Sequence, residues 1–403
     1  MRFAHISDCH IGSWNNHPEL EKMPNNAFTK AVDICISENV DFVLIAGDLF
    51  NTSLPPIDAL SNTTTDLKKL KDAGIPVYVI AGSHDFSPSG KTMLSVLENA
   101  GLIKNIATEI EGETTIKYIE EDNAIIAGIS GKKGSLEHED YKKIIVPEDI
   151  LNSNKFKIFM FHSAIEEFKP PHLEGMHAVP LSNLPKGFDY YASGHVHAVY
   201  NKYEDGLGWI VFPGCLFPCN FTELEKNCCG GFYIVDIVDG EVNLEFVELK
   251  ECDTTLIEIN ANGKSSKEVE EEILQTLEKN KLENKIVLLK VEGTLENGTP
   301  SDIDFKKISD VCKDALTIKK NFSQLKTKEF QEIEKSFVNM EDLEINIIKE
   351  HIDQSNLYNQ EKDMLLVLDL MKTLETEKME GENNDQFLDR IVSNAEKILN
   401  IEK

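Results

Sequence analysis

The chain has 403 residues, 41% of them hydrophobic, which is enough for two or three domains with sizeable cores. No stretch reaches the ~18 uninterrupted apolar residues of a membrane span, and the first residues show no signal-peptide pattern, so we expect a cytoplasmic protein. The formal charge of −29 excludes a general, charge-driven coat on DNA, which needs a basic surface. It does not exclude an enzyme of nucleic acids, because bound divalent metals can reverse the local field.

Strands and helices alternate in the first part of the chain. The expected strands are short apolar runs at 3–7, 40–46 and 75–80. The expected helices are one capped by Asn26, one at 57–72 and one at 91–99.

The middle of the chain is rich in expected strands, at 115–119, 124–129, 157–161, 190–193, 209–212, 231–237 and 242–249. Strands that alternate with helices and then follow one another predict an α/β fold of mixed sheets packed between helices.

The pattern resets near residue 251. Strands at 254–259 and 286–291, with helices at 266–279 and 302–312, predict a small separate α/β domain over 251–328. Residues 329–403 form an acidic tail in which apolar residues recur at helical spacing in three stripes. The first stripe is Leu343, Ile347 and Ile348, the second is Met364, Val367, Leu368 and Met371, and the third is Phe387, Ile391 and Ile398. These helices either bind a partner or pack back on their own chain.

Polar residues gather directly after five of the expected strands. In chain order they are Asp8 and His10, then Asp48, then Ser83, His84 and Asp85, then His162, and finally His195 and His197. In an open sheet, ligands bind beyond the carboxyl ends of the strands, so we expect these side chains to converge.

Such a set suits a pair of metal ions. His-x-His in an extended chain points both imidazoles to one side, and an Asp after a neighbouring strand can bridge two ions. Mixed Asp and His ligands suit Mn²⁺, Fe or Zn²⁺ better than Ca²⁺. Two ions ~3.5–4 Å apart can clamp a phosphate and activate water. Each motif alone is usually structural, but the ordered set of five predicts a two-metal phosphoesterase.

The series D-x-H, G-D, G-N-H-[DE], H and G-H-x-H is the signature of the calcineurin-like metallophosphoesterase superfamily, which this chain resembles through about residue 250. The segments ISDCHIG at 6–12, GDLF at 47–50 and PG at 213–214 are similar to the archaeal meiotic-recombination-eleven and bacterial SbcD nucleases.

The resemblance implies a sandwich of two mixed β-sheets flanked by helices at 1–250, a small α/β capping domain at 251–328 and a helical segment at 329–403. That segment would bind an SMC-like coiled-coil ATPase of the SbcC type. The resemblance also implies a homodimer that hydrolyses DNA with two divalent ions, most commonly Mn²⁺. Its exonuclease and endonuclease activities would process DNA ends in double-strand break repair, so it would be nucleoid-associated when active.

Carried over residue by residue, the resemblance implies a first ion on Asp8, His10 and His197, a bridging Asp48, and a second ion on His162 and His195. His84 would lie near the scissile phosphate and stabilise charge or protonate the leaving oxygen. Asp85 would either orient the His84 imidazole or stabilise the turn.

Two positions depart from the family pattern. Ser83 stands where the family has Asn, and a hydroxyl is a shorter and weaker ligand than an amide carbonyl, so Ser83 would ligate the second ion directly, through a water or not at all. Asn51 stands where some nuclease relatives have His. The sequence therefore supports phosphodiester hydrolysis more strongly than it supports exonuclease activity on duplex ends. Two alternatives stay open: a phosphodiesterase or phosphatase for small substrates, and a repair-complex scaffold with a weakened second metal site.

Cys215, Cys219, Cys228 and Cys229 lie close together, but Cys-x3-Cys followed by Cys-Cys is not a standard zinc spacing, so structural thiols are favoured over a zinc cluster. For His172, His177 and the lysine pairs at 132–133 and 142–143, surface roles are favoured over contacts with substrate.

Overall fold

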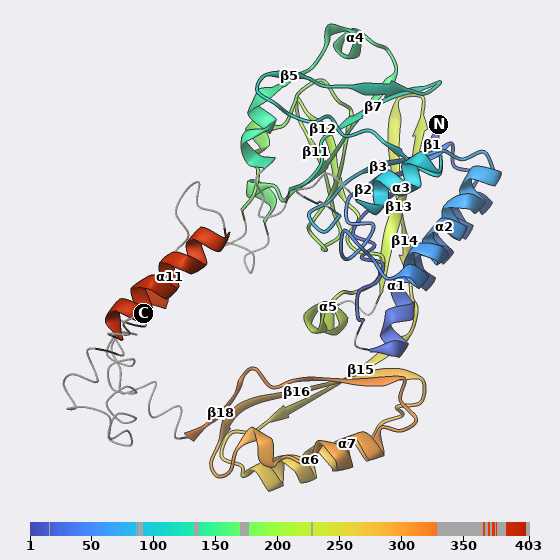
Figure 1. Cartoon of the computed structure of the whole chain (residues 1–403). Helices are drawn as coiled ribbons and strands as arrows, with labels where there is room; N and C mark the ends of the chain where they lie inside the picture. Colours follow the sequence, from blue (N-terminus) through green and yellow to red (C-terminus); the bar gives the residue numbers. More distant parts are fainter. Residues whose placement is uncertain are drawn as a thin grey trace. The chain divides into compact units, whose positions relative to one another are not determined.

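Two mixed six-stranded sheets dominate the computed structural model (Figure 1). It describes residues 1–15, 17–85, 87, 92–132, 137–169, 177–226, 229–328, 366, 370, 373–374, 376 and 384–399. The predicted α/β class with mixed sheets flanked by helices is confirmed. No helix in these residues is long and apolar enough to cross a membrane.

The first sheet has the order β14 (Glu241–Leu249), β13 (Gly230–Val238), β1 (Arg2–Ile6), β2 (Phe42–Ala46), β3 (Val77–Ile80) and β4 (Lys104–Asn105). Strands β1 to β4 run parallel, and β13 is antiparallel to both of its neighbours. The carboxyl ends of β1, β2 and β3 therefore lie at one edge of the sheet.

The second sheet has the order β11 (Tyr200–Glu204), β12 (Gly208–Phe212), β10 (Tyr190–Gly194), β9 (Phe156–His162), β7 (Ala124–Gly128) and β6 (Tyr118–Glu120). The four inner strands are parallel, and the two outer strands are antiparallel to their neighbours. Gly194 at the end of β10 pairs with His162 at the end of β9.

Alternating side chains of the two sheets form the core between them. In β2, Phe42, Leu44 and Ala46 pack in one cluster with Ile158 and Met160 of β9. The intervening residues of β2 belong to a second cluster, which includes the helices on the outer face of the first sheet. Because successive side chains point to opposite faces and both faces are buried, every residue of such a strand is apolar, and the strand is a continuous apolar run in the sequence.

Three helices pack against the first sheet, namely α1 (Pro18–Ser37), α2 (Ile57–Asp72) and α3 (Met93–Asn99) (Figure 1). The prediction that Asn26 caps the first helix is wrong, because α1 begins at Pro18 and Asn26 lies inside it. Proline suits the first helical position, where an N–H would have no partner. Pro24 lies inside α1 and is buried, so packing outweighs its low helix propensity.

Other predicted elements differ in their bounds. The strand expected at 115–119 is divided into β5 (Thr114–Thr115), which pairs with β8 (Ile144–Ile145), and β6. The helix expected at 302–312 is α7 (Phe305–Val311), because the Asp304 side chain caps it by accepting from the amides of Lys306 and Lys307. Residue 91, expected to begin a helix, lies outside the described residues, and two short helices, α4 (Glu148–Leu151) and α5 (Phe221–Lys226), were not predicted.

The remaining described elements are β15 (Asp253–Asn260), α6 (Ser266–Lys279), β16 (Lys285–Leu295), β17 (Thr317–Asn321), β18 (Leu325–Thr327) and α11 (Asn384–Ile398). The chain divides into one compact unit of Met1–Ile259, Glu270–Val291 and Asp304–Ser323, and another of Asn260–Val269, Glu292–Ile303 and Gln324–Lys403. The domain boundaries after residues 250 and 328 stay predictions. The apolar stripes expected around Leu343 and Met364 lie outside the described residues.

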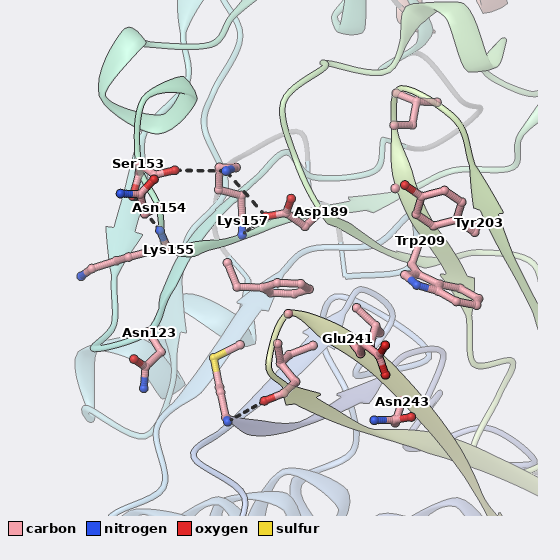
Figure 2. A pocket seen from close by; sticks show the side chains of 17 residues that line it. Asn123, Ser153, Asn154, Lys155, Lys157, Asp189, Tyr203, Trp209, Glu241 and Asn243 are labelled. Carbon is pink, nitrogen blue, oxygen red and sulfur yellow. Dashed lines mark hydrogen bonds and ion pairs between the residues drawn. The ribbon is translucent and has the colours of Figure 1, made fainter.

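A cavity of about 1020 Å³ opens where β1, β9 and β12 begin, at the opposite strand ends from the polar motifs (Figure 2). Its lysines are already paired, because Lys157 Nζ lies 3.7 Å from Asp189 and Lys155 Nζ lies 3.1 Å from Glu120. The cavity contains none of the predicted site residues, so the chemistry lies elsewhere.

Candidate metal centre

The carboxyl ends of β1, β2, β9 and β10 bring the predicted ligands together. His162 Nε2 lies 3.2 Å from Asp48 Oδ2, and His197 Nε2 lies 3.6 Å from Asp8 Oδ1. His10 Nε2 lies 3.7 Å from Asp48 and 3.9 Å from Asp8. His195 joins the group through its backbone N–H, which donates to Asp8 at 3.0 Å, and its ring lies 5.2 Å from that of His162.

Four of these residues have a strained backbone. The φ angles are 49° at Asp8, 43° at His10, 52° at Asp48 and 81° at His195, all in the left-handed region. Each such conformation of a non-glycine residue costs ~1–3 kcal/mol and persists where the surroundings impose it. Strain on this scale in four neighbouring polar residues marks a functional site.

Glycines leave the room that the ligands occupy. A Cβ at Gly47 would lie 2.3 Å from His162 Nδ1, and one at Gly82 would lie 2.2 Å from Asp48 Oδ1. A Cβ at Gly194 would lie 2.4 Å from the Ala46 carbonyl. The glycines of Gly-Asp and Gly-His-Val-His are therefore required where the two sheets approach each other, and Gly82 is required where the turns after β2 and β3 approach each other.

Backbone and hydroxyl groups hold the ligands in place. His162 Nδ1 donates to the Ala46 carbonyl at 2.8 Å, which directs Nε2 toward Asp48. That Nε2 is buried and has no hydrogen-bond partner in the described part of the chain. Asp8 accepts from the Ser7 hydroxyl at 2.6 Å, and Asp48 accepts from the His84 amide at 2.8 Å. A buried, orphaned imidazole nitrogen beside two carboxylates is an arrangement that fits a metal ion.

The charges of the site point to the same conclusion. Burial raises the pKa of Asp8, whereas Asp48 keeps a pKa below its usual value despite burial, because His162 stabilises its charge. Burial opposes the charge on His162, yet Asp48 and Asp8 raise its pKa to about 10. Burial and the neighbouring His197 lower the pKa of His10 to about 3. The two carboxylates thus attract positive charge into the pocket, and divalent cations on neutral imidazoles would supply it.

His84, Ser83 and Asp85 form the turn after β3. His84 is exposed beside the cluster, with its ring 4.8 Å from that of His10, and its Nδ1 donates to the Asn51 carbonyl at 2.8 Å. Asp85 is buried and accepts hydrogen bonds from the backbone amides of Leu49, Phe50 and Gly82. It therefore stabilises the turn, and the His84 ring is oriented by the Asn51 carbonyl. Ser83 is half-buried, and within the described residues its hydroxyl has no hydrogen-bond partner.

Sequence reasoning missed Glu223 in α5. Its Oε1 accepts from His197 Nδ1 at 2.9 Å, and its Oε2 accepts from the Cys219 amide at 2.7 Å. Burial opposes charge on His197, but Glu223 raises the pKa of this imidazole to about 10. The spacing Asn220-x-x-Glu223 resembles a capping box, a signal for the start of the unpredicted helix α5, but it carries no information about the contact with His197.

The surface interpretations of other polar residues are consistent with the structure. Lys132 Nζ lies 2.6 Å from Asp140, and Lys142 Nζ lies 2.9 Å from Glu139. His177 is exposed and its ring lies 6.0 Å from that of His138. Lys133, His172 and Cys228 lie outside the described residues.

Comparison with known proteins agrees with this site. The family model described as calcineurin-like phosphoesterase matches residues 1–199. The fold and the site therefore define a metal-dependent phosphoesterase.

The relatives specify the family. The DNA double-strand break repair protein Mre11 of Sulfolobus acidocaldarius is 31% identical over 302 residues, covering 73% of this chain and 76% of that protein. The Mre11 of Methanococcus maripaludis is 27% identical, covering 92% of this chain and 99% of that protein. The Mre11 of Methanocaldococcus jannaschii is 28% identical, covering 96% and 98%. The chain belongs to the Mre11 family.

Proposed function

We propose that this protein is a Mn²⁺-dependent DNA phosphodiesterase that processes DNA ends, as exonuclease and endonuclease, in double-strand break repair. The observation that carries the proposal is the convergence of Asp8, His10, Asp48, His162, His195 and His197 from two sheets, in a member of the Mre11 family.

The ligand roles follow from the contacts. Asp8, His10 and His197 would hold the first ion, because the Nε2 atoms of the two imidazoles lie 3.0 Å apart beside Asp8. His162 and His195 would hold the second ion, with Ser83 as an additional ligand. Asp48 would bridge, since its Oδ2 is within 3.7 Å of His10 and 3.2 Å of His162. Bound ions would polarise the phosphate and lower the pKa of water.

His84 is suited to act on the phosphate. It is exposed at the edge of the cluster, and the Asn51 carbonyl accepts from Nδ1, so Nε2 is left for the substrate. In the imidazolium form Nε2–H can donate to the leaving oxygen, and the Nδ1–H bond to the Asn51 carbonyl orients the ring. Asp85 supports this group by holding the turn that carries it.

A partner would supply much of the affinity for DNA, because the chain has a net charge of −29. We propose an SMC-like coiled-coil ATPase that binds the acidic tail at 329–403. We also propose a homodimer through α2 and α3, where Ile57 is 84% exposed and Val96 is 50% exposed. The site of action would be the cytoplasm.

The test is a nuclease assay with Mn²⁺, single-stranded DNA and duplex ends, with and without the ATPase. Asp8→Asn and His84→Gln should each abolish cleavage, while His177→Gln, a change at another exposed histidine, should not. Absence of metal-dependent cleavage, with bound metal confirmed and the partner present, would refute the proposal.

The acidic charge favours a second candidate, a phosphodiesterase for small substrates. It predicts faster turnover of a chromogenic diester than of DNA phosphodiester bonds, whereas the nuclease predicts the reverse. A third candidate, a scaffold with a weakened second site, predicts fewer than two bound ions in a Mn²⁺ titration.

A further inference from the structure

The loop between β12 and α5 brings a thiol to the imidazoles of the proposed first ion. Cys219 Sγ lies within 4.8 Å of a ring nitrogen of His10 and of one of His197. The Nε2 atoms of these two rings lie 3.0 Å apart, whereas Nδ1 of His197 lies against Glu223. A cavity of about 320 Å³ beside Glu223 is lined by Cys215 but not by Cys219. The Cys219 thiol therefore joins the two rings on the side where the ion would bind.

Two hydrogen bonds hold the Cys219 loop in this position. The Cys219 amide donates to Glu223 Oε2 at 2.7 Å, and the other oxygen of the same carboxylate accepts from His197 Nδ1 at 2.9 Å. The Trp14 indole N–H donates to the Pro218 carbonyl at 3.0 Å, which ties this loop to the loop after β1. One carboxylate thus orients an imidazole and the backbone of the thiol together, in the way that outer groups orient the ligands of a metal.

The distances suit ligands of one ion. Ligand atoms with bonds of about 2.0–2.3 Å to a tetrahedral Zn²⁺ lie ~3.3–3.8 Å apart. The Nε2 atoms of His10 and His197 lie 3.0 Å apart, and Asp8 Oδ1 lies 3.9 Å and 3.6 Å from them. Cys219 Sγ donates a weak hydrogen bond to the Phe217 carbonyl at 3.3 Å. A small rotation of the Cys219 side chain would exchange this hydrogen bond for a bond to the ion.

We propose that the Cys219 sulfur is a further ligand of the first ion. The inference rests on the proposed metal centre, in which this ion lies on Asp8, His10, His197 and the bridging Asp48. Without a bound ion the thiol keeps its proton, because its hydrogen bond with Cys215 and its burial raise the pKa of Cys219. Binding breaks the S–H bond, the proton leaves to solvent, and a sulfur–metal bond forms.

A sulfur ligand makes the first site selective among metals. Thiolates prefer Zn²⁺ and other thiophilic ions, whereas Mn²⁺ prefers carboxylate, carbonyl and water oxygens. The proposed ligands of the second ion include no sulfur, and they are His162, His195, Ser83 and the bridging Asp48. Zn²⁺ should therefore compete with Mn²⁺ more strongly at the first site than at the second, and loss of the Cys219 sulfur should weaken this competition at the first site alone.

The test uses the full-length chain, freed of metal and titrated with Co²⁺, a spectroscopic substitute for Zn²⁺. The wild-type chain should give a sulfur-to-cobalt charge-transfer band. Cys219→Ser should abolish this band, while Cys215→Ser, at the neighbouring thiol, should keep it. Cys219→Ser should also raise the Kd for Zn²⁺ by at least the ~10-fold that loss of an outer group costs. It should leave the Kd for Mn²⁺ nearly unchanged, which shows that the variant folds.

A second measurement does not depend on variants. X-ray absorption of the wild-type chain with one equivalent of Zn²⁺ should show a sulfur ligand at about 2.3 Å beside nitrogen and oxygen ligands. A shell of nitrogen and oxygen alone would overturn the proposal. So would a Co²⁺ band that survives Cys219→Ser and is lost in Cys215→Ser, because that ion would lie on the Glu223 side of His197.

The failure of this inference differs from the failure of the proposed function. Two bound ions without any sulfur band would refute the role of Cys219 and leave the metal centre standing. No bound ion at all would refute the metal centre itself, and the role of Cys219 with it.

Discussion

His5 should make the stability of this fold sensitive to acid. The residue is completely buried on β1, between the two sheets. Its Nδ1 accepts from the Tyr190 hydroxyl at 2.9 Å, and its Nε2 donates to the Ser193 carbonyl at 3.1 Å, so the neutral ring is fully satisfied. Burial lowers its pKa to about 3 from 6.5.

The sign and size follow from proton linkage. Because the folded pKa lies below the unfolded value, the unfolded state takes up the proton more readily. The stabilisation is complete above pH 6.5 and is lost as the pH falls from 6.5 toward 3. At about 1.4 kcal/mol per pH unit, the loss at pH 5 is ~2 kcal/mol. His5 connects β1 to β10 through these two hydrogen bonds. The loss of folding free energy therefore weakens the contact between the two strands that precede Asp8 and His195.

The assay compares urea unfolding of the wild-type chain and His5→Gln, both free of metal, at pH 7.5 and pH 5. The variant should be less stable at pH 7.5, because it leaves buried polar groups unpaired. When the pH is lowered from 7.5 to 5, the free energy of unfolding of the variant should fall by ~2 kcal/mol less than that of the wild type. Equal losses in the two proteins would refute the reasoning, since the other titrating groups are common to both.

Three further predictions concern the metal centre. Glu223→Gln should weaken binding of the first ion by roughly 10-fold, because a neutral amide orients His197 less strongly, while Glu225→Gln on the same helix should leave it unchanged in a Mn²⁺ titration. Gly82→Ala should cost ~1–3 kcal/mol in thermal unfolding and reduce the number of bound ions, because its Cβ displaces Asp48; an unchanged stoichiometry would contradict the required close approach. Ser83→Asn should tighten the second ion roughly 10-fold, or ~1.4 kcal/mol, in the same titration, and an unchanged Kd would exclude this position as a ligand.

The sequence by itself determined the strands and the polar motifs that follow them. Runs such as Phe42–Ala46 are buried on both faces, and such runs are visible as uninterrupted apolar sequence. Asp8, Asp48 and His162 could be selected because parallel strands carry their following residues to one edge of a sheet. The glycines beside them belong to the same local pattern, since each marks a point where no side chain fits.

Only the tertiary structure decided how these residues are supported. Glu223 reaches His197 from a short helix 26 residues further along the chain. Cys215 and Cys219, interpreted from sequence as structural thiols, lie beside the same ring. Asp85 binds backbone amides around Asp48, and His5 is held between the two sheets. Such contacts depend on how loops pack against one another, and side-chain spacing within one segment carries no information about a partner in another.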